Sequence, residues 1–376
     1  MRVPGPRALG LFWAAVILVL ALGAGTLAWL GPPEEQVAEA PAAEVPAATA
    51  AAPEAPAAPQ PAAEPPPDPP APVAVAAPPV LAEPPAAPEP PPLAVAVSRR
   101  TAAEPVIVPP DPQLLEPARH GPVPRLGPNN RTSIRTYARP FDRDDRRPRI
   151  GIIVNNIGLF AQHSEEAIRR LPGAVTLAVS PYALRPDPLL ERARARGMEL
   201  LVALPLEPQG YGQQADPGER ALLTGLTIGE NLDRLDWVLS RTQGYVGAIG
   251  GLGGMRGERF AASPELLGTI QATLTRRGLL YVDPRPGAPQ PARAFGRSVD
   301  ILLDEPSAVR AEVERRLAAL EALARAQGSA LGLANDPVPS VVAAIASWSA
   351  GIEDRGLVIA PVTVLIRRPA EQAVVR

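Results

Sequence analysis

Two side-chain amides follow an apolar run near the middle of the chain, at a place where chemistry could occur. The run Ile150–Val154 has the length and composition of a buried β-strand, and Asn155 and Asn156 come directly after it. The carboxyl end of such a strand is where α/β enzymes hold their catalytic residues. Two aspartates here would suit a metal site with a general base. Asparagine amides can donate and accept hydrogen bonds to a ligand, or satisfy only local backbone groups, but they cannot take up a proton at neutral pH.

Polar or glycine-rich positions follow the later apolar runs as well. Such residues are expected wherever a buried strand emerges into water, so they indicate a site only if the fold brings them together. Parallel strands would do so, because their carboxyl ends share one edge of the sheet. The positions are Ser180, Glu207, Gly250–Gly254, Asp283 with Arg285, Asp304 with Glu305, and Asn335 with Asp336.

The counts of cysteine and histidine restrict the chemistry that these positions can perform. The chain has no cysteine, which excludes disulfides and thiol catalysis. It has two histidines, and His120 lies in the Pro- and Arg-rich part before the apolar runs. A metal site with two histidines therefore cannot be built in one domain, and His163 is interpreted as a surface or capping residue. The net charge of -2 favours neither nucleic acid nor an acidic substrate.

The elements that must position these residues alternate along the chain from Arg149 onward. Apolar runs of strand length are followed by segments with helical periodicity, capping residues or a closing glycine. Such alternation implies an α/β fold with a parallel sheet, either closed into a barrel or open and doubly wound. The predicted strands are 150–154, 175–179, 199–204, 246–249, 279–283, 299–303, 330–334 and 357–362. The predicted helices are 164–170, capped by Ser164, 186–196, 227–243 with a capping box, 263–278 with Pro264 in its first turn, 307–327 and 340–355.

Residues 1–30 are predicted to anchor the protein in a membrane. The uncharged run from Ala8 to Leu30 is long enough to span a bilayer as a helix, and Arg2 and Arg7 precede it. Basic residues before the span place the N-terminus in the cytoplasm, so the protein is predicted to be a single-pass protein of the inner membrane with its domain in the periplasm. A cleaved signal peptide is the alternative, because small residues near Ala38 could serve a peptidase.

Residues 31–148 are predicted to form a disordered, proline-rich linker. The chain has 51 prolines among 376 residues, and between residues 31 and 98 it combines Pro, Ala and Val with acidic residues only. Such a composition buries too little apolar surface to offset the entropy of ordering, so it favours an extended spacer. Residues 99–149 are rich in arginine and are interpreted as an unstructured lead-in, or as a contact with an anionic surface. The folded domain is then 149–376.

From about Arg149 to Val364, the order of segments resembles that of the divergent polysaccharide deacetylases, relatives of the NodB-like carbohydrate esterases. The resemblance implies an α/β fold of the distorted (β/α)7 barrel type. It does not extend to the predicted anchor or linker. The matching pieces are IIVNNIG, VTLAVSPYA, ELLVALPLEPQG, LLTGLTIGE, YVGAIGGLGGMRGERF, GLLYVDPRPGA, ILLDEPSAV and LGLANDPVPS.

The resemblance also implies a hydrolytic metal site, and this chain departs from it at each position. In the family, an aspartate pair ends the first strand, and histidines from later strands complete a site where a metal activates water for attack on an acetamide. Here Asn155 and Asn156 replace the pair, Ala203 and Gly251 replace histidines, and Asp336 stands where a C-terminal histidine would be. Amides are weak, uncharged ligands, and Gly and Ala supply none. We therefore assign no metal ligand and no catalytic residue.

Some polar residues of the family pattern are kept, and they are the candidate ligand contacts. Asp283 and Arg285 are interpreted either as an ion pair that holds a strand end or as a pair that contacts the ligand. The candidate ligand-binding residues are Asn155, Asn156, Glu207, Asp283, Arg285 and Asp304.

The sequence thus leaves three functional hypotheses. The first is a membrane-anchored periplasmic deacetylase-like domain that is non-catalytic, needs no cofactor, and binds a glycan or a cell-envelope protein. The second is an active metal-dependent carbohydrate deacetylase, in which Glu207, Asp283, Asp304 and Asp336 hold a hard divalent cation such as Mg²⁺ or Ca²⁺. The third is an envelope scaffold whose linker performs the function.

Overall fold

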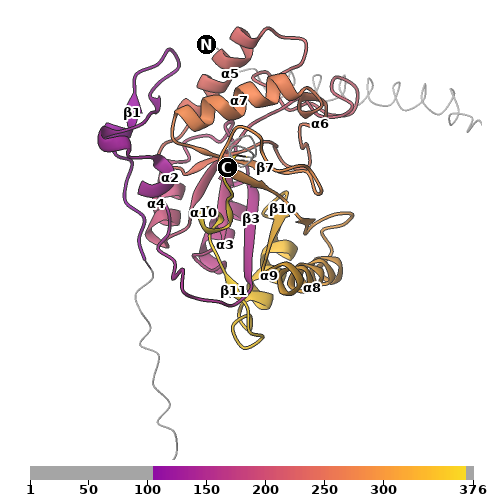
Figure 1. Ribbon diagram of the computed structural model, residues 1–376. Coiled ribbons are helices and arrows are strands. Elements are labelled where there is room, and N and C mark those ends of the chain that lie inside the picture. The colour runs from indigo at the N-terminus through magenta and orange to yellow at the C-terminus, as the bar shows by residue number, and fades with distance from the viewer. Residues whose placement is uncertain (1–104, 370–376) are drawn as a thin grey trace, which may run out of the picture. The chain divides into compact units, whose positions relative to one another are not determined.

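Residues 105–369 are described by the computed structural model, and they form an α/β domain around a curled parallel sheet (Figure 1). The predicted anchor and residues 31–104 of the predicted linker lie outside the described residues. Within 105–369, none of the helices is both long enough and apolar enough to cross a bilayer. All described elements belong to one compact unit, Leu93–Arg376, which has its own hydrophobic core and is therefore expected to fold alone.

The segment 105–148 is folded, which corrects the prediction of a disordered linker up to residue 148. Its side chains Leu114, Val123 and Tyr137 are buried and join the apolar clusters of the domain that follows. The hydroxyl of Tyr137 accepts a hydrogen bond of 2.8 Å from the backbone N–H of Asp111. The composition of this segment did not predict its order, because its scattered apolar residues pack against residues that are far away in the sequence. The elements are η1 (Pro112–Leu114), β1 (Leu115–Glu116), β2 (Val123–Pro124), η2 (Pro128–Asn130) and α2 (Ser133–Thr136).

The main sheet has nine strands, and every adjacent pair in it is parallel. The strands read as continuous apolar runs because both faces of such a sheet are covered. Their order is β8-β7-β6-β5-β4-β3-β10-β9, with β11 beside the start of β3. They are β3 (Arg149–Ile157), β4 (Thr176–Val179), β5 (Leu200–Ala203), β6 (Gly247–Ile249), β7 (Leu280–Asp283), β8 (Gly296–Ser298), β9 (Ile301–Leu302), β10 (Ser329–Ala334) and β11 (Val358–Ile359).

The predicted strand 299–303 proves to be part of a segment that serves both edges of the sheet. Only Val299 and Asp300 separate β8 from β9, yet β8 pairs with β7 while β9 pairs with β10. The N–H of Val299 donates to the carbonyl of Asp283, and the N–H of Asp300 donates to that of Leu331, each at 2.9 Å. The sheet therefore curls until its two edges meet one segment, which fits the expected (β/α)7 barrel.

Helices connect the strands, and two of them begin at the capping residues that the sequence indicated. Thr227 and Glu230 form the predicted capping box of α5, and Ser263 caps α7 with Pro264 in the first turn. The bounds are α3 (Ala161–Arg170), α4 (Asp187–Ala195), α5 (Ile228–Ser240), α6 (Glu258–Ala261), α7 (Pro264–Arg276), α8 (Arg310–Gln327), α9 (Pro339–Ser349) and α10 (Val362–Leu365).

The predicted cap at Ser164 is wrong, because α3 starts one turn earlier. The Ser164 hydroxyl lies within the helix, donates to the carbonyl of Phe160 at 2.8 Å, and accepts from the N–H of Gly158 at 2.9 Å. It therefore ties the helix to the loop after β3 instead of ending the helix.

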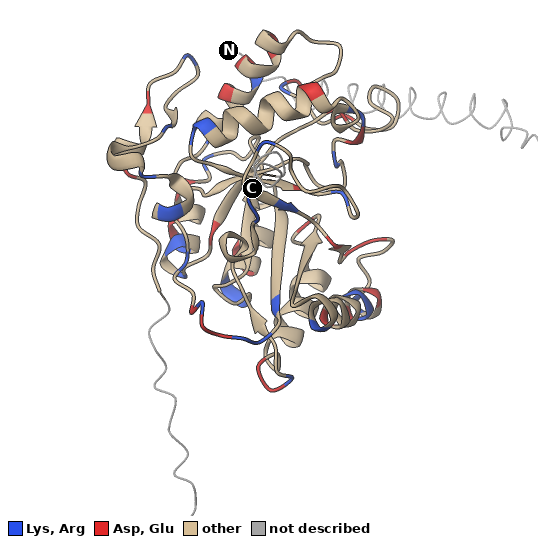
Figure 2. Ribbon diagram, in the orientation of Figure 1, with Lys and Arg blue, Asp and Glu red and all other residues tan. Residues whose placement is uncertain are grey.

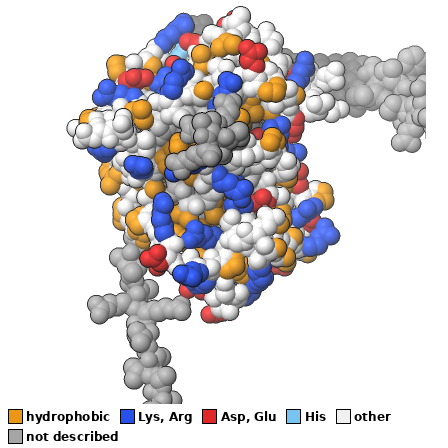
Figure 3. Space-filling view, in the orientation of Figure 1, with side chains coloured by type: hydrophobic (Ala, Val, Ile, Leu, Met, Phe, Trp, Pro, Cys, Tyr) orange, Lys and Arg blue, Asp and Glu red, His pale blue; other side chains and the backbone are white. Residues whose placement is uncertain are grey.

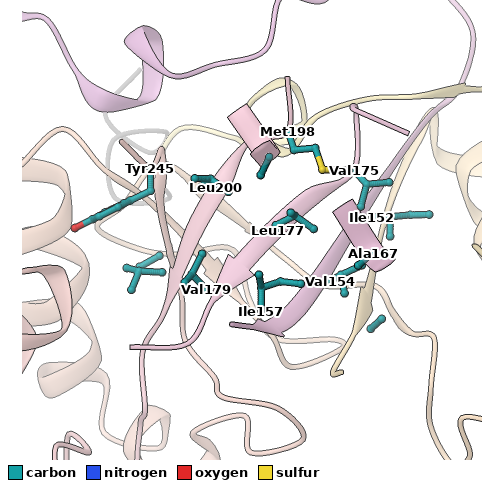
Figure 4. Packing of buried hydrophobic residues seen from close by; sticks show 14 of the residues in the cluster. Ile152, Val154, Ile157, Ala167, Val175, Leu177, Val179, Met198, Leu200 and Tyr245 are labelled. Atoms are coloured by element: carbon teal, nitrogen blue, oxygen red, sulfur yellow. The ribbon is translucent and has the colours of Figure 1, made fainter. Parts of the chain in front are cut away.

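Alternate strand residues pack into two different apolar clusters. Ile152 and Val154 of β3 belong to the larger cluster, which also contains Ala167 of α3 (Figure 4), whereas Ile153 belongs to the smaller one. In β5, Val202 and Ala203 divide in the same way. Charged residues lie mainly on helices and loops, and the central strands are mostly uncharged (Figure 2). The sheet is thus a rigid apolar platform, and polar groups gather where its strands end.

Candidate functional site

The candidate site lies at the carboxyl ends of the strands, and β3 supplies its first two residues. The register between β3 and β4 shifts between Val154 and Ile157, and Asn155 and Asn156 occupy the shift. The φ angle of Asn156 is 61°, in the left-handed region that asparagine adopts more readily than most residues. The backbone N–H of Asn156 donates to Oδ1 of Asn155 at 2.8 Å. This irregular end lets both amides bond to other segments.

Asn155 is fully buried, and its side chain is engaged on both sides. Its Nδ2 donates to the carbonyl of Gly251 at 3.2 Å, while its Oδ1 serves the backbone of Asn156. The residue therefore fastens the end of β3 to the glycine-rich turn Gly250–Gly254. This geometry fits the local structural role, which is one of the two roles that the sequence left open for Asn155.

Asn156 and Asp336 join the ends of β3 and β10. The Nδ2 atom of Asn156 donates to Oδ1 of Asp336 at 2.6 Å. Gly253 lies against this pair, since a Cβ at that position would stand 2.9 Å from Asn156 Nδ2. The glycine-rich turn can approach so closely because it lacks a side chain there.

Asp304, after β9, forms the second half of the site. Its Oδ2 accepts the N–H groups of Asn335 at 2.7 Å and Asp336 at 3.2 Å, and its Oδ1 accepts from Asn335 Nδ2 at 3.1 Å. The pKa of Asp304 is raised to about 6, chiefly by burial and to a smaller extent by the carboxylate of Asp336, while hydrogen bonds from backbone N–H groups oppose the shift. The Asp304 carboxyl therefore keeps its proton to a higher pH than an ordinary aspartate.

Glu305 links this cluster to the glycine-rich turn. One Glu305 oxygen accepts from Asn335 Nδ2 at 3.0 Å and forms an ion pair with Arg256. Arg256 also lies 3.4 Å from a carboxylate oxygen of Glu258. The sequence-based list of candidates missed Arg256, although a single arginine just after a glycine-rich turn at a strand end was a usable signal.

Two acceptor atoms in this cluster have no hydrogen-bond partner among the described residues. They are Oδ1 of Asn156 and Oδ1 of Asn335, and both are buried. A buried, unpaired acceptor costs roughly 1–3 kcal/mol unless a ligand or water donates to it. The cluster is therefore arranged to receive hydrogen-bond donors, with the carboxylates of Asp304 and Asp336 beside these atoms.

The remaining predicted residues lie at strand ends but pair within their own surroundings. The guanidinium of Arg285 donates to both oxygens of Asp283, at 2.9 and 2.7 Å, so the two form a closed ion pair. The buried carboxylate of Glu207 accepts a hydrogen bond of 2.7 Å from the hydroxyl of Thr224 and forms an ion pair with Arg259 at 3.1 Å. The contact between Asp283 and Arg285 is the ion pair that the sequence left open as one of two interpretations.

The residues present do not fit the metal site of the resembled family. The Ala203 side chain packs in the smaller apolar cluster, and Gly251 offers only its carbonyl, which Asn155 occupies. Across residues 105–369, no three His, Cys, Asp or Glu side chains are grouped so that they could hold a metal ion. His120 instead contacts Asp233 at 3.0 Å, and the ring of His163 packs against Phe160. The four carboxylates of the cation hypothesis are likewise not assembled.

Comparison with known proteins agrees with the resemblance seen in the sequence. Residues 152–366 match the divergent polysaccharide deacetylase family. An uncharacterized protein of Haemophilus influenzae is 24% identical over 204 residues, which cover 52% of this chain and 69% of that protein. The solved structure of an uncharacterized protein from Agrobacterium tumefaciens has a TM-score of 0.60 and 33% identity, covering 65% of this chain and 99% of the other. The chain belongs to the divergent polysaccharide deacetylase family.

Proposed function

We propose that the domain binds a glycan at the carboxyl ends of its strands and does not hydrolyse it. The observation that carries the proposal is the pair of buried, unpaired acceptors, Asn156 Oδ1 and Asn335 Oδ1, beside the carboxylates of Asp304 and Asp336. Sugar hydroxyl groups are the donors that such a site would receive. The family's name supports a polysaccharide as the class of ligand.

The residue types at the strand ends do not suit hydrolysis. An amide at position 156 cannot accept the proton of an attacking water, and its only described polar contact is with Asp336. Two of the four carboxylates in the cation hypothesis are already paired with arginines, Asp283 with Arg285 and Glu207 with Arg259. A single carboxylate pair, Asp304 with Asp336, is too few ligands for Mg²⁺ or Ca²⁺ alone.

Binding can be tested on the compact unit 93–376 by titration calorimetry with chitooligosaccharides and soluble peptidoglycan fragments. We expect binding that falls at least about tenfold in Asn156→Gly, because glycine tolerates the positive φ but removes the amide. Asn129→Gly is the matched control, since Asn129 also has a positive φ of 57° and lies in η2. Loss in both variants, or no binding by the unaltered protein, would refute the binding proposal.

Catalysis is tested on the same samples. Bound metal is measured by mass spectrometry after purification, and release of acetate is followed over hours with the same saccharides. Stoichiometric metal together with acetate release would overturn the non-catalytic proposal and favour the metal-dependent deacetylase. We expect neither.

We further propose that the N-terminal segment holds the domain at the periplasmic face of the inner membrane. The support is the uncharged run Ala8–Leu30 preceded by Arg2 and Arg7. Protease treatment of spheroplasts should degrade the domain while a cytoplasmic marker survives. Deleting residues 31–104 while keeping the anchor tests the scaffold hypothesis, which requires a phenotype from the deletion alone.

A further inference from the structure

A second polar feature lies at the other end of the sheet, where the strands begin. It is a cleft of about 810 Å³ bordered by α2 and the chain after it, by the residues that precede β7 and β8, and by α10 and the residues after it. This volume is within the range of small-ligand sites in proteins. None of the residues named in the glycan proposal lines it, so the cleft is an independent feature.

The charge of the cleft is positive. None of the described residues that line it is Asp or Glu, and all of its arginines except Arg139 form no ion pair with another described residue. Several basic side chains gather on the face turned toward the viewer in Figure 3, with hydrophobic side chains between them. The lining arginines are Arg135, Arg139, Arg143, Arg367 and Arg368.

Backbone contacts hold the frame of this cleft in place. Arg367 exchanges two hydrogen bonds with Gly296, at 2.8 and 3.0 Å, which fixes the chain after α10 against β8. The N–H of Ile134 donates to the carbonyl of Gly278 at 3.3 Å. The guanidinium of Arg139 donates to the carbonyls that follow α4, at 3.2 and 3.1 Å. The cleft is therefore formed by three separate parts of the chain that are tied to one another.

A buried acid beside the cleft, Glu199, is held by hydrogen bonds from the backbone and from Thr363. Glu199 precedes β5, and its oxygens accept the N–H groups of Arg139 and Thr363, at 2.9 and 3.1 Å, and the Thr363 hydroxyl. Burial raises the pKa of Glu199 to about 7, so its negative charge is incomplete at neutral pH. Asp145, on the neighbouring loop, is already paired with Arg147 at 2.6 Å.

Apolar side chains share the lining with the arginines. Ile134, Phe141, Phe295 and Ile366 are each partly exposed within it. A purely ionic ligand would leave this apolar surface in contact with water, whereas a purely apolar ligand would desolvate the arginines without compensation. The lining thus favours a ligand that is anionic at one end and apolar at the other.

We propose that this cleft binds a phosphate group carried on an apolar stem. Guanidinium groups match phosphate oxygens in forked, charge-assisted hydrogen bonds, which lysine-poor, arginine-lined sites exploit. The stem would lie against the aromatic and aliphatic side chains. The same chemistry is offered by a phospholipid headgroup and by a soluble phosphorylated amphiphile.

The test uses the unit 93–376 and three probes: hexyl phosphate, inorganic phosphate and hexanol. Calorimetric titration at low salt should show one site for hexyl phosphate, with at least about tenfold weaker binding of the other two. Binding as tight with inorganic phosphate would overturn the apolar part of the proposal. Binding as tight with hexanol would overturn the phosphate part, and no binding of hexyl phosphate would overturn the whole.

Two variants place the binding in the cleft. The double variant Arg367→Ala/Arg368→Ala should weaken hexyl phosphate binding about tenfold or more. Arg169→Ala is the control, because Arg169 is exposed on α3 and has no ion pair with a described residue. Equal effects of the two changes, with unaltered thermal unfolding in both, would show that general charge rather than the cleft binds the probe.

The source of the phosphate is distinguished with vesicles. We compare cosedimentation with vesicles of phosphatidylcholine alone and with vesicles that also contain phosphatidylglycerol. Cosedimentation with only the second kind, abolished by the double variant, assigns the ligand to a lipid headgroup. Binding of hexyl phosphate without vesicle binding assigns it to a soluble amphiphile.

Discussion

The Nδ2 atom of Asn156 donates a 2.6 Å hydrogen bond to Oδ1 of Asp336, which lies 180 residues further along the chain. In the resembled hydrolytic site, an aspartate and a histidine would stand at these two positions. Here an amide and a carboxylate satisfy each other instead. The two side chains avoid charge repulsion because the amide of Asn156 is neutral. A substitution that makes both side chains acidic is therefore a direct test of the site.

Asn156→Asp should destabilise the domain by about 1–3 kcal/mol, because it removes the donor and places two carboxylates in contact. Aspartate tolerates the left-handed backbone at this position, so the change isolates the charge effect. Urea denaturation measures this change in the free energy of unfolding. The reversed pair, Asn156→Asp/Asp336→Asn, should recover most of the loss, and a double variant no more stable than the single one would contradict this account.

Gly253→Ala should be costly, whereas Gly254→Ala should be nearly neutral. A Cβ at position 253 would stand 2.9 Å from Asn156 Nδ2 on a backbone with φ of 56°, but at position 254 it would meet no atom within 4 Å. We expect about 1–3 kcal/mol for the first change and less than about 0.5 kcal/mol for the second. Thermal unfolding of the two variants side by side decides it, and similar losses would argue against a close packing of this turn.

Arg285→Ala should destabilise the domain by about 3 kcal/mol, because it leaves the buried carboxylate of Asp283 without its cation. Arg259→Ala should cost less than about 1 kcal/mol. Its side chain is 58% exposed, and Glu207 keeps two hydrogen bonds from Thr224. Chemical denaturation of both variants provides the comparison, and equal losses would mean that Asp283 has other support.

Stability should fall between pH 4.5 and pH 7 because of Glu199, whose pKa is raised by burial from 4.5 to about 7. The folded protein holds this proton in that range and the unfolded chain does not. The contribution of Glu199 to the free energy of unfolding is therefore complete below the pKa that this residue has in the unfolded chain. It is lost as the pH rises through the pKa of Glu199 in the folded protein.

Glu199→Gln should flatten that pH profile by on the order of 3 kcal/mol. Some slope should remain, because the pKa of Asp304 is raised in the same direction. Glu219→Gln serves as the control, since its side chain is 83% exposed. An unchanged profile in Glu199→Gln, measured by denaturation at several pH values, would show that this carboxyl does not titrate in the folded state as described.

Leu114→Ala should cost about 2–5 kcal/mol, because Leu114 is fully buried in the segment that precedes the sheet. Leu126→Ala is the control within the same segment, since Leu126 is 41% exposed, and it should change stability by less than about 0.5 kcal/mol. A negligible effect of Leu114→Ala in thermal unfolding would restore the view that this segment is a linker.

The elements after Arg149 could be predicted because local signals agreed with the fold. Strands buried on both faces are continuous apolar runs, and the capping box at Thr227 and Glu230 marks a helix start without any tertiary information. The start of the domain could not be predicted in this way. Leu114 and Tyr137 are buried in a cluster that includes residues of distant strands, and no periodicity in a Pro- and Arg-rich segment predicts such contacts.

The position of the candidate site was predictable from the sequence, but the pairing of its side chains was predictable only in part. Parallel strands had to bring Asn156, Asp304 and Asp336 to one end, and they do. Which carboxylate is neutralised depends on side-chain directions that spacing does not determine. The pair of Asp283 and Arg285, two residues apart, was one of the interpretations that the sequence offered, whereas the Arg259 that meets Glu207 lies on a different element.

The segment that contains β8 and β9 also bears on how the domain avoids unwanted association. The terminal strands of the sheet are only three and two residues long, so a foreign strand would find few unpaired backbone groups to extend. Strand addition, a common route both to peptide capture and to edge-to-edge aggregation, is therefore disfavoured at these two edges. Recognition at these edges would then depend on side chains, which are more readily changed by substitution than a backbone ladder.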